Sequence, residues 1–244
     1  MCQTRPQLRL GFPFGCLKYT MRYHTLHRLL ESQFDPEERL EACANLILDK
    51  AKPWLNAIGG VNNLDKYILY RGMSSNTPSE EQGFVMNHRR HQQPRVSIAM
   101  PPDVKAAWQK SIHGAGKVAD RENSLLCTGE ALHADTFGSV MVIIPLGEFN
   151  YTWIEGIDDL NNWWWFELGD AGTEHMEDDE AERMDMMRER FLNGELDLTI
   201  RGDDNSMKEA LRDQAEIMLH VKDHRYIAIR PDFYDELTRM MVAQ

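Results

Sequence analysis

Hydrophobic residues recur at helical spacing near the start of the chain, just after residue 35. Steps of three and four residues separate the apolar positions, which predicts an amphipathic helix. Asp35, Pro36 and Glu38 form a typical helix-start signal, and Pro53 ends the pattern. The apolar positions are Leu40, Cys43, Ala44, Ile47, Leu48 and Ala51.

Strand patterns follow in several later segments. Residues 139–144 form a continuous apolar run, typical of a buried strand, and residues 149–153 alternate apolar and polar side chains. Residues 215–221 and 225–229 are predicted to be two terminal strands joined by a tight turn at 222–224. Further strands are predicted at 67–72 and 124–128.

The remaining segments are predicted to be helices and one long loop. Residues 74–101 are polar and proline-containing, and a loop of that length in a compact domain is often functional. Asp103 is predicted to cap a short helix that runs through Trp108 and has Gly114 near its end, and residues 130–137 to make one or two helical turns. Residues 174–192 are predicted to form an acidic helix with Met184, Met187 and Phe191 on one face. Two further helices are predicted to begin at the capping pair Ser206 and Glu209 and near Asp232.

Helices and strands are mixed along the chain without a regular βαβ repeat, which favours an α+β fold. The length of 244 residues fits one large domain or two small ones. We expect residues 1–60 to form an N-terminal helical segment that packs on a main domain of residues 61–244.

Composition and charge narrow the classes of function. The formal net charge is −12, so phosphate backbones are repelled and a nucleic-acid partner is disfavoured. The four cysteines fit neither a zinc site nor a disulfide framework, which favours reduced thiols in the cytoplasm. No apolar run reaches the ~18 residues of a membrane helix, and the histidines lack metal-ligand spacing, so neither a membrane span nor a metal site is predicted.

Polar residues stand at unusual places on three predicted strands. Arg71 lies at the end of an apolar strand, Ser124 opens the second, and Gln214 and Glu216 stand two apart at the start of a third. Residues two apart on a strand share a face, so Gln214 and Glu216 are predicted to point together into one cleft. Each residue also has an ordinary structural interpretation. In that case Arg71 pairs with an acid, Ser124 caps a turn, and Glu216 is a solvated charge.

In this order, Tyr70-Arg71-Gly72, Asn123-Ser124-Leu125 and Gln214-Ala215-Glu216 resemble the Arg–Ser–Glu pattern of ADP-ribosyltransferases, in its Gln-x-Glu variant. The stretch 66–230 also resembles uncharacterised proteins encoded by bacteriophages. The resemblance implies an ADP-ribosyltransferase-like split mixed sheet with flanking helices, and NAD as a substrate.

The resemblance also implies a role for each residue. Arg71 would anchor the pyrophosphate of NAD, because a guanidinium group binds such oxygens in pairs. Ser124 would hold the site together by hydrogen bonds, and Glu216 would bind the ribose 2′-hydroxyl and stabilise the cationic sugar. Gln214 would meet the acceptor, and the Gln-x-Glu form accompanies acceptors other than arginine in that family.

The serine motif departs from the family pattern. It is often Ser-Thr-Ser, whereas two leucines follow Ser124 here. Thr128, four residues further on the same strand face, is the candidate to replace one missing hydroxyl. Tyr70 and Gly72, the neighbours of Arg71, complete the expected NAD-binding set, although tyrosines in such positions are also common in protein cores.

Three tryptophans, Trp163, Trp164 and Trp165, stand in a row before Phe166. They cannot all face one core from a regular strand or helix. We therefore predict some exposed aromatic surface, and a partner contact there, with a folded-back loop as the alternative.

The leading hypothesis is a phage-type mono-ADP-ribosyltransferase of the cytoplasm that moves ADP-ribose from NAD to a host protein or other macromolecule. A second hypothesis is a non-catalytic phage protein on the same fold, either a virion component or an inhibitor that binds a host factor. A third is a nucleotide-binding domain that sequesters a dinucleotide signal.

Overall fold

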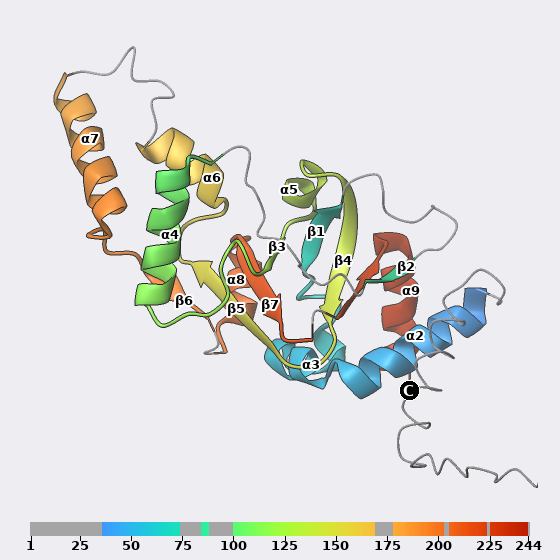
Figure 1. Cartoon of the computed structure of the whole chain (residues 1–244). Coiled ribbons are helices and arrows are strands. Elements are labelled where there is room, and N and C mark those ends of the chain that lie inside the picture. The colour runs from blue at the N-terminus through green and yellow to red at the C-terminus, as the bar shows by residue number, and fades with distance from the viewer. Residues whose placement is uncertain are drawn as a thin grey trace, which may run out of the picture.

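Figure 1 shows an elongated molecule whose strands lie in the middle, with α4 and α7 at one end and α2 and α9 at the other. These helices span Pro102–Gly114, Asp178–Asn193, Pro36–Lys50 and Pro231–Val242, respectively. The computed structural model describes residues 36–73, 84–87, 100–168, 178–202, 205–223 and 225–243.

The described strands form two four-stranded sheets, and every pairing within them is antiparallel. The predicted α+β class is confirmed, but the expected mixed sheet is wrong in the described part of the chain. The first sheet has the order β1-β4-β8-β2, formed by Tyr70–Met73, Ser139–Pro145, Tyr226–Ile229 and Phe84–Asn87. The second has the order β3-β7-β5-β6, formed by Leu125–Cys127, Ile217–Val221, Phe149–Ile154 and Ile200–Arg201.

An isolated backbone bridge between Tyr70 and Thr128 connects the two sheets. The Tyr70 amide donates to the Thr128 carbonyl at 2.8 Å, and the Thr128 amide donates back at 2.9 Å. This bridge sets β1 beside β3. The segment that carries Arg71 therefore lies beside the strand that follows Ser124.

Several strands that follow one another along the chain belong to different sheets. The two predicted terminal strands exist as β7 and β8, but they do not pair with each other. β7 lies between β3 and β5, and β8 lies between β4 and β2. β4 and β5 are divided between the sheets in the same way. Along the described strands the chain changes sheet four times, after β2, β3, β4 and β7.

The main hydrophobic core lies between the sheets and a group of helices that includes α2, α3 (Lys52–Ile58), α8 (Met207–Arg212) and α9. Ile47 of α2 and Trp54 of α3 are buried in the same cluster as Ile143 of β4 and Leu219 of β7. The predicted helix after residue 35 is confirmed from Pro36 onward, and Asp35 lies outside the described residues. Pro53 stands in the first turn of the next helix, where a missing amide hydrogen costs nothing.

A second hydrophobic cluster joins α4 and α7 to a short helix, α6 (Leu160–Trp163), which continues as a π-helical turn, η3 (Trp164–Leu168). Phe191 of α7 is fully buried there, against Trp108, Trp163 and Trp164.

The tryptophan run is therefore mostly core, and a partner surface made of all three tryptophans is wrong. Trp164 is buried and Trp163 packs against the second cluster. Exposed aromatic surface does remain at Trp165, which is 38% exposed, and at Phe166, which is 66% exposed.

Helix ends differ in detail from the sequence signals. Ser206 precedes α8 but makes no capping hydrogen bond; its hydroxyl instead accepts from the indole Nε1 of buried Trp153 at 2.8 Å. Asp103 lies inside the first turn of α4 rather than capping it, because the cap position is Pro101. The prediction of one long loop at 74–101 is wrong at residues 84–87, which form β2, and most of the other residues of the segment lie outside the described ones.

The remaining helices are short or match their predicted positions. The expected helical turns at 130–137 are α5 (Ala131–Asp135), and η1 (Val61–Asn63) is a 3-10 turn. The acidic helix predicted at 174–192 is α7, whose residues Met184 and Phe191 are buried as expected. Among the described helices, none combines the length and apolar composition needed to cross a bilayer.

Candidate functional site

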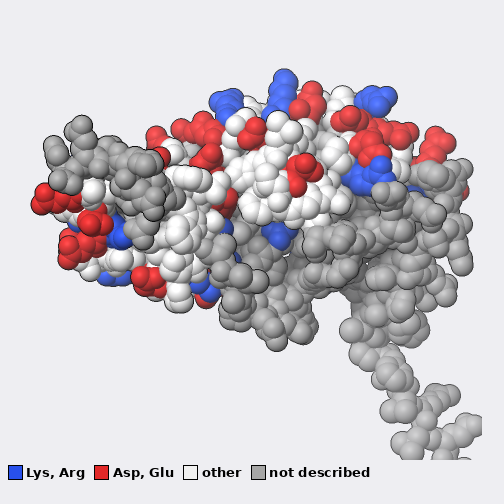
Figure 2. Space-filling model, turned by 90° about the horizontal axis from the view of Figure 1, so that it is seen from above, with Lys and Arg blue, Asp and Glu red and all other residues white. Residues whose placement is uncertain are grey.

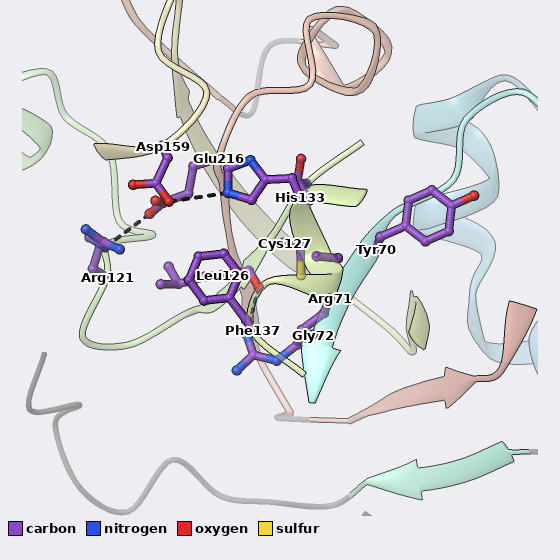
Figure 3. A pocket seen from close by; sticks show the side chains of 12 residues that line it. Tyr70, Arg71, Gly72, Arg121, Leu126, Cys127, His133, Phe137, Asp159 and Glu216 are labelled. Carbon is purple, nitrogen blue, oxygen red and sulfur yellow. Dashed lines mark hydrogen bonds and ion pairs between the residues drawn. The ribbon is translucent and has the colours of Figure 1, made fainter. Parts of the chain in front are cut away.

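A cavity of about 110 Å³ lies where the two sheets meet, under α5 (Figure 3). β1, the β3 segment and α5 supply most of its wall, and three charged side chains arrive from the loops before β3, α6 and β7. The lining residues are Tyr70, Arg71, Gly72, Arg121, Leu126, Cys127, Thr128, His133, Ala134, Phe137, Asp159 and Glu216.

The structure brings most of the predicted site residues to this one cavity. Tyr70, Arg71 and Gly72 line it from β1, Thr128 from the end of β3, and Glu216 from the residue before β7. Ser124 and Gln214, the other two predicted site residues, do not line it.

Ser124 is fully buried, and its hydroxyl donates to the Asn123 side-chain oxygen at 2.7 Å. The serine thus stabilises the loop that leads into β3. Among the described contacts none joins Ser124 to Glu216.

The prediction that Gln214 points into the same cleft as Glu216 is wrong, because the backbone at Gln214 is not extended. Its φ is +58°, in the left-handed region, and its side chain is exposed. The rule that residues two apart share a face holds only for extended backbone, so Gln214 and Glu216 point differently. The Gln214 carbonyl accepts from the Thr128 hydroxyl at 3.0 Å, which fixes the turn just before Glu216.

Arg71 lies at one end of the cavity. Its Nη1 donates to the Leu126 carbonyl at 2.7 Å, which holds the guanidinium against β3 (Figure 3). Among the described residues the partner is thus a carbonyl oxygen rather than the acid that the ordinary interpretation suggests. No acidic side chain in the described part of the chain forms an ion pair with Arg71.

Glu216 lies at the other end and is only 7% exposed, so it is not a solvated charge. Its Oε2 accepts from the Leu160 amide at 3.3 Å, and its Oε1 is 3.1 Å from Arg121 Nε. The Arg121 N–H is not aligned with Oε1, which makes an ion pair but no hydrogen bond. Burial raises the pKa of Glu216, and the charge of Arg121 opposes that shift.

Asp159 and His133 form a second charged pair beside Glu216. Asp159 Oδ1 caps α6 by accepting from the amides of Asn161 (2.8 Å) and Asn162 (2.7 Å), and its Oδ2 is 3.3 Å from His133 Nε2. The hydrogen bond with Asp159 raises the pKa of His133 against the effect of burial. Burial acts to raise the pKa of Asp159, but its bonds with His133 and Asn162 outweigh it and leave that pKa below the ordinary value.

Arg121, His133 and Asp159 were missed in the sequence analysis. Asp159 carries a signal, since an aspartate directly before a short helix is a common cap. Arg121 and Glu216 are 95 positions apart in sequence (216 − 121) and meet only through the pairing of β3 with β7. No local pattern indicates such a contact.

The cavity thus has a cation at one end and a mixed cluster of two carboxylates, a guanidinium group and an imidazole at the other. Among the described residues, no group of three or more acidic, histidine or cysteine side chains is arranged to hold a metal ion. Comparisons of the chain with protein-family models, with curated proteins and with solved structures found no match.

Proposed function

We propose that this protein is a mono-ADP-ribosyltransferase that moves ADP-ribose from NAD to a macromolecule, with an ADP-ribosyltransferase-like arrangement of its two sheets. The observation that carries the proposal is the convergence of Arg71 and Glu216 on one cavity. The two residues are far apart in sequence: Arg71 lies on β1 of the first sheet, and Glu216 directly precedes β7 of the second. A guanidinium group at one end and a buried carboxylate at the other match the two charges that NAD presents to such an enzyme.

Arg71 is suited to the pyrophosphate of the dinucleotide. Its contact with the Leu126 carbonyl uses one nitrogen and holds the group in place, and no described residue accepts from its other N–H groups, which are suited to phosphate oxygens. Pockets for drug-sized ligands measure about 300–1,000 Å³, so a cavity of about 110 Å³ takes one ring. In the proposed complex the nicotinamide ring enters the cavity, and the rest of NAD lies across its mouth.

Glu216 is suited to the ribose. Breaking the bond between nicotinamide and C1′ moves an electron pair onto the leaving ring and leaves positive charge on the sugar. A carboxylate fixed in a buried site stabilises that charge more strongly than one in water. Arg121 and the Leu160 amide favour the ionised form of Glu216 that this role requires.

Thr128 takes over part of the role expected of the serine motif. Its hydroxyl lies at the cavity and holds the turn before Glu216 through the Gln214 carbonyl. The turn fixes the start of β7 and therefore the position of the carboxylate. The missing hydroxyls after Ser124 are compatible with the proposal on this basis.

Label transfer from NAD tests the proposal. The protein is incubated with NAD labelled on its adenylate part and a bacterial lysate, since the resemblance to phage-encoded proteins makes a host macromolecule the proposed acceptor. Removing one electrostatic group of this kind typically lowers kcat by about 10²–10³-fold, and we expect that loss for Glu216→Gln. Glu155→Gln is the matched control, because Glu155 pairs with Arg201 on the surface and does not line the cavity.

Absence of both label transfer and NAD cleavage in the wild-type protein would overturn the proposal. Equal activity of Glu216→Gln and wild type would also overturn it. Arg71→Ala gives an independent arm, in which we expect the KM for NAD to rise more than kcat falls, because Arg71 is assigned to binding.

A non-catalytic protein on the same fold is the second candidate, and exposed apolar side chains around the site favour it. Leu132 and Phe137, on and just after α5, are 77% and 61% exposed, and Phe137 lines the cavity. Trp165 and Phe166, which belong to η3 and do not line the cavity, are exposed as well. Figure 2 shows acidic groups toward both ends of one face and a mainly uncharged area between them. Calorimetry separates the candidates: NAD bound without turnover indicates sequestration, and no NAD binding indicates a protein-binding role.

A further inference from the structure

A chain of contacts leads from α5 to the carboxylate of Glu216. His133 on α5 contacts Asp159 through Nε2, and Asp159 caps the first turn of α6. The first amide of that helix, from Leu160, donates to Glu216. Figure 3 shows His133, Asp159, Glu216 and Arg121 following one another along one side of the cavity.

The histidine is held firmly on its other side. α5 packs against β1 so closely that a Cβ at Gly72 would lie 2.1 Å from the Ala134 carbonyl. The imidazole also stacks on Phe137, with ring centroids 5.6 Å apart. His133 therefore has little freedom to follow Asp159 if that carboxylate moves.

We propose that His133 is a titratable positioning residue of the site: its protonated ring anchors Asp159 at the start of α6, so that the Leu160 amide and Arg121 remain on Glu216. The effect of His133 on ADP-ribose transfer rests on the proposed function. The contacts themselves do not depend on that function.

Charge balance explains why the proton matters. Within the described ranges, the charged groups that act most strongly on His133 are Asp159, Asp158 and Glu216, with Arg121 on the far side of the carboxylates. With His133 protonated, two cations match the inner carboxylates Glu216 and Asp159. After His133 loses its proton, both carboxylates share Arg121, which is drawn toward Asp159 and away from Glu216.

Side-chain titration by NMR tests this directly and needs no activity. In the wild-type protein, we expect the Glu216 carboxyl ¹³C signal to show a second inflection at the pH where the His133 ring titrates. His133→Gln keeps a polar donor but cannot gain a proton. In that variant, we expect the second inflection to disappear and Glu216 itself to titrate at a higher pH.

His113→Gln is the matched control. His113 makes the same kind of ion pair, with Asp120 at 2.9 Å, but neither residue lines the cavity. Its removal should leave both Glu216 inflections in place. A Glu216 signal in the wild type that ignores the His133 titration would overturn the inference, as would equal effects of the two substitutions.

The transfer assay adds a second arm. We expect kcat in the wild type to fall as pH rises through the His133 titration, with the KM for NAD retained, and this high-pH decline to be absent in His133→Gln. If no variant transfers ADP-ribose, the proposed function fails, whereas the NMR titration still decides the role of His133. A His133→Gln profile that keeps the high-pH decline would overturn that role.

Discussion

The Arg121–Glu216 pair is the residue-scale feature on which the proposed chemistry depends. Both side chains are largely buried, at 16% and 8% exposure, so each charge has lost most of its water. Breaking such a pair by removing one partner typically costs about 3–5 kcal/mol, because the other charge is left unpaired. Glu216 can avoid this cost by binding a proton, because the protonated carboxyl group is neutral.

Arg121→Met should therefore destabilise the protein in a pH-dependent manner. At pH 8 the variant must either bury an unpaired Glu216 charge or bind a proton from a solution that contains few of them, and both cost free energy. We therefore expect the free energy of unfolding to fall by about 3–5 kcal/mol at this pH. At pH 5 the loss should be clearly smaller, since Glu216 takes up a proton easily. Urea unfolding of both proteins at the two pH values measures this.

The double variant Arg121→Met with Glu216→Gln provides the control. It has no buried charge at this position, so most of the pH 8 stability should return. Equal losses at pH 5 and pH 8, or a double variant as unstable as the single one at pH 8, would contradict a buried and charge-compensated Glu216.

At this scale the sequence predicted the ends of the cavity better than its interior. Arg71 and Glu216 stand out as charged residues beside apolar strands, and both line the cavity. Gln214 was misplaced because its positive φ cannot be inferred from alternation. Arg121 and His133 act through partners that only tertiary pairing brings close.

The contact between α5 and β1 is the element-scale feature that shapes the cavity. Gly72 allows the helix to lie directly on the strand, because a Cβ there would be 2.1 Å from the Ala134 carbonyl and 2.8 Å from Phe137. A backbone carbonyl cannot move aside as the end of a flexible side chain can. Any larger residue at this position must displace α5, and His133 with it.

Gly72→Ala should therefore lower stability by about 1–3 kcal/mol, the usual cost of overpacking. Under the proposed function, this substitution should also weaken NAD binding, because the α5 wall of the cavity shifts. Unfolding in urea and calorimetry with NAD measure the two effects. Gly114→Ala is the control: it ends α4 with open space around its Cβ position, so we expect no loss of stability. Similar results for both variants would rule out a close α5–β1 contact.

Most of the longer described helices and strands were predicted from the sequence, whereas the short elements α3, α6, β2 and β6 and the pairing of the strands were not. Periodicity located the strands that became β4, β5, β7 and β8, because alternation and apolar runs are local signals. It could not show that β7 and β8, although adjacent in sequence, belong to different sheets. Strand pairing depends on packing between residues far apart in sequence, here including the helices that pack against the sheets.

At the scale of the whole molecule, the two sheets share one core, and a second core at one end contains most of the tryptophan run. The helices α2 and α3 are buried among residues of both sheets. The short helix that starts at Leu160 links the second core to Glu216, since Leu160 is buried there and its amide donates to the carboxylate. Charge changes in the cavity therefore act on the stability of the folded chain as a whole.

The pH dependence of that stability follows from the pKa of His133, which lies above its ordinary value of 6.5 in the folded protein. Because the folded state binds the proton more tightly, the stabilisation is fully present below about pH 6.5 and is lost as pH rises through the folded pKa. His133→Gln lacks it at every pH. The difference in unfolding free energy between wild type and this variant should thus shrink between pH 6 and pH 9, as measured by urea unfolding. His113→Gln serves again as the comparison, and a wild-type advantage over His133→Gln that stays constant or grows with pH would show that the His133–Asp159 pair does not stabilise the fold through its charge.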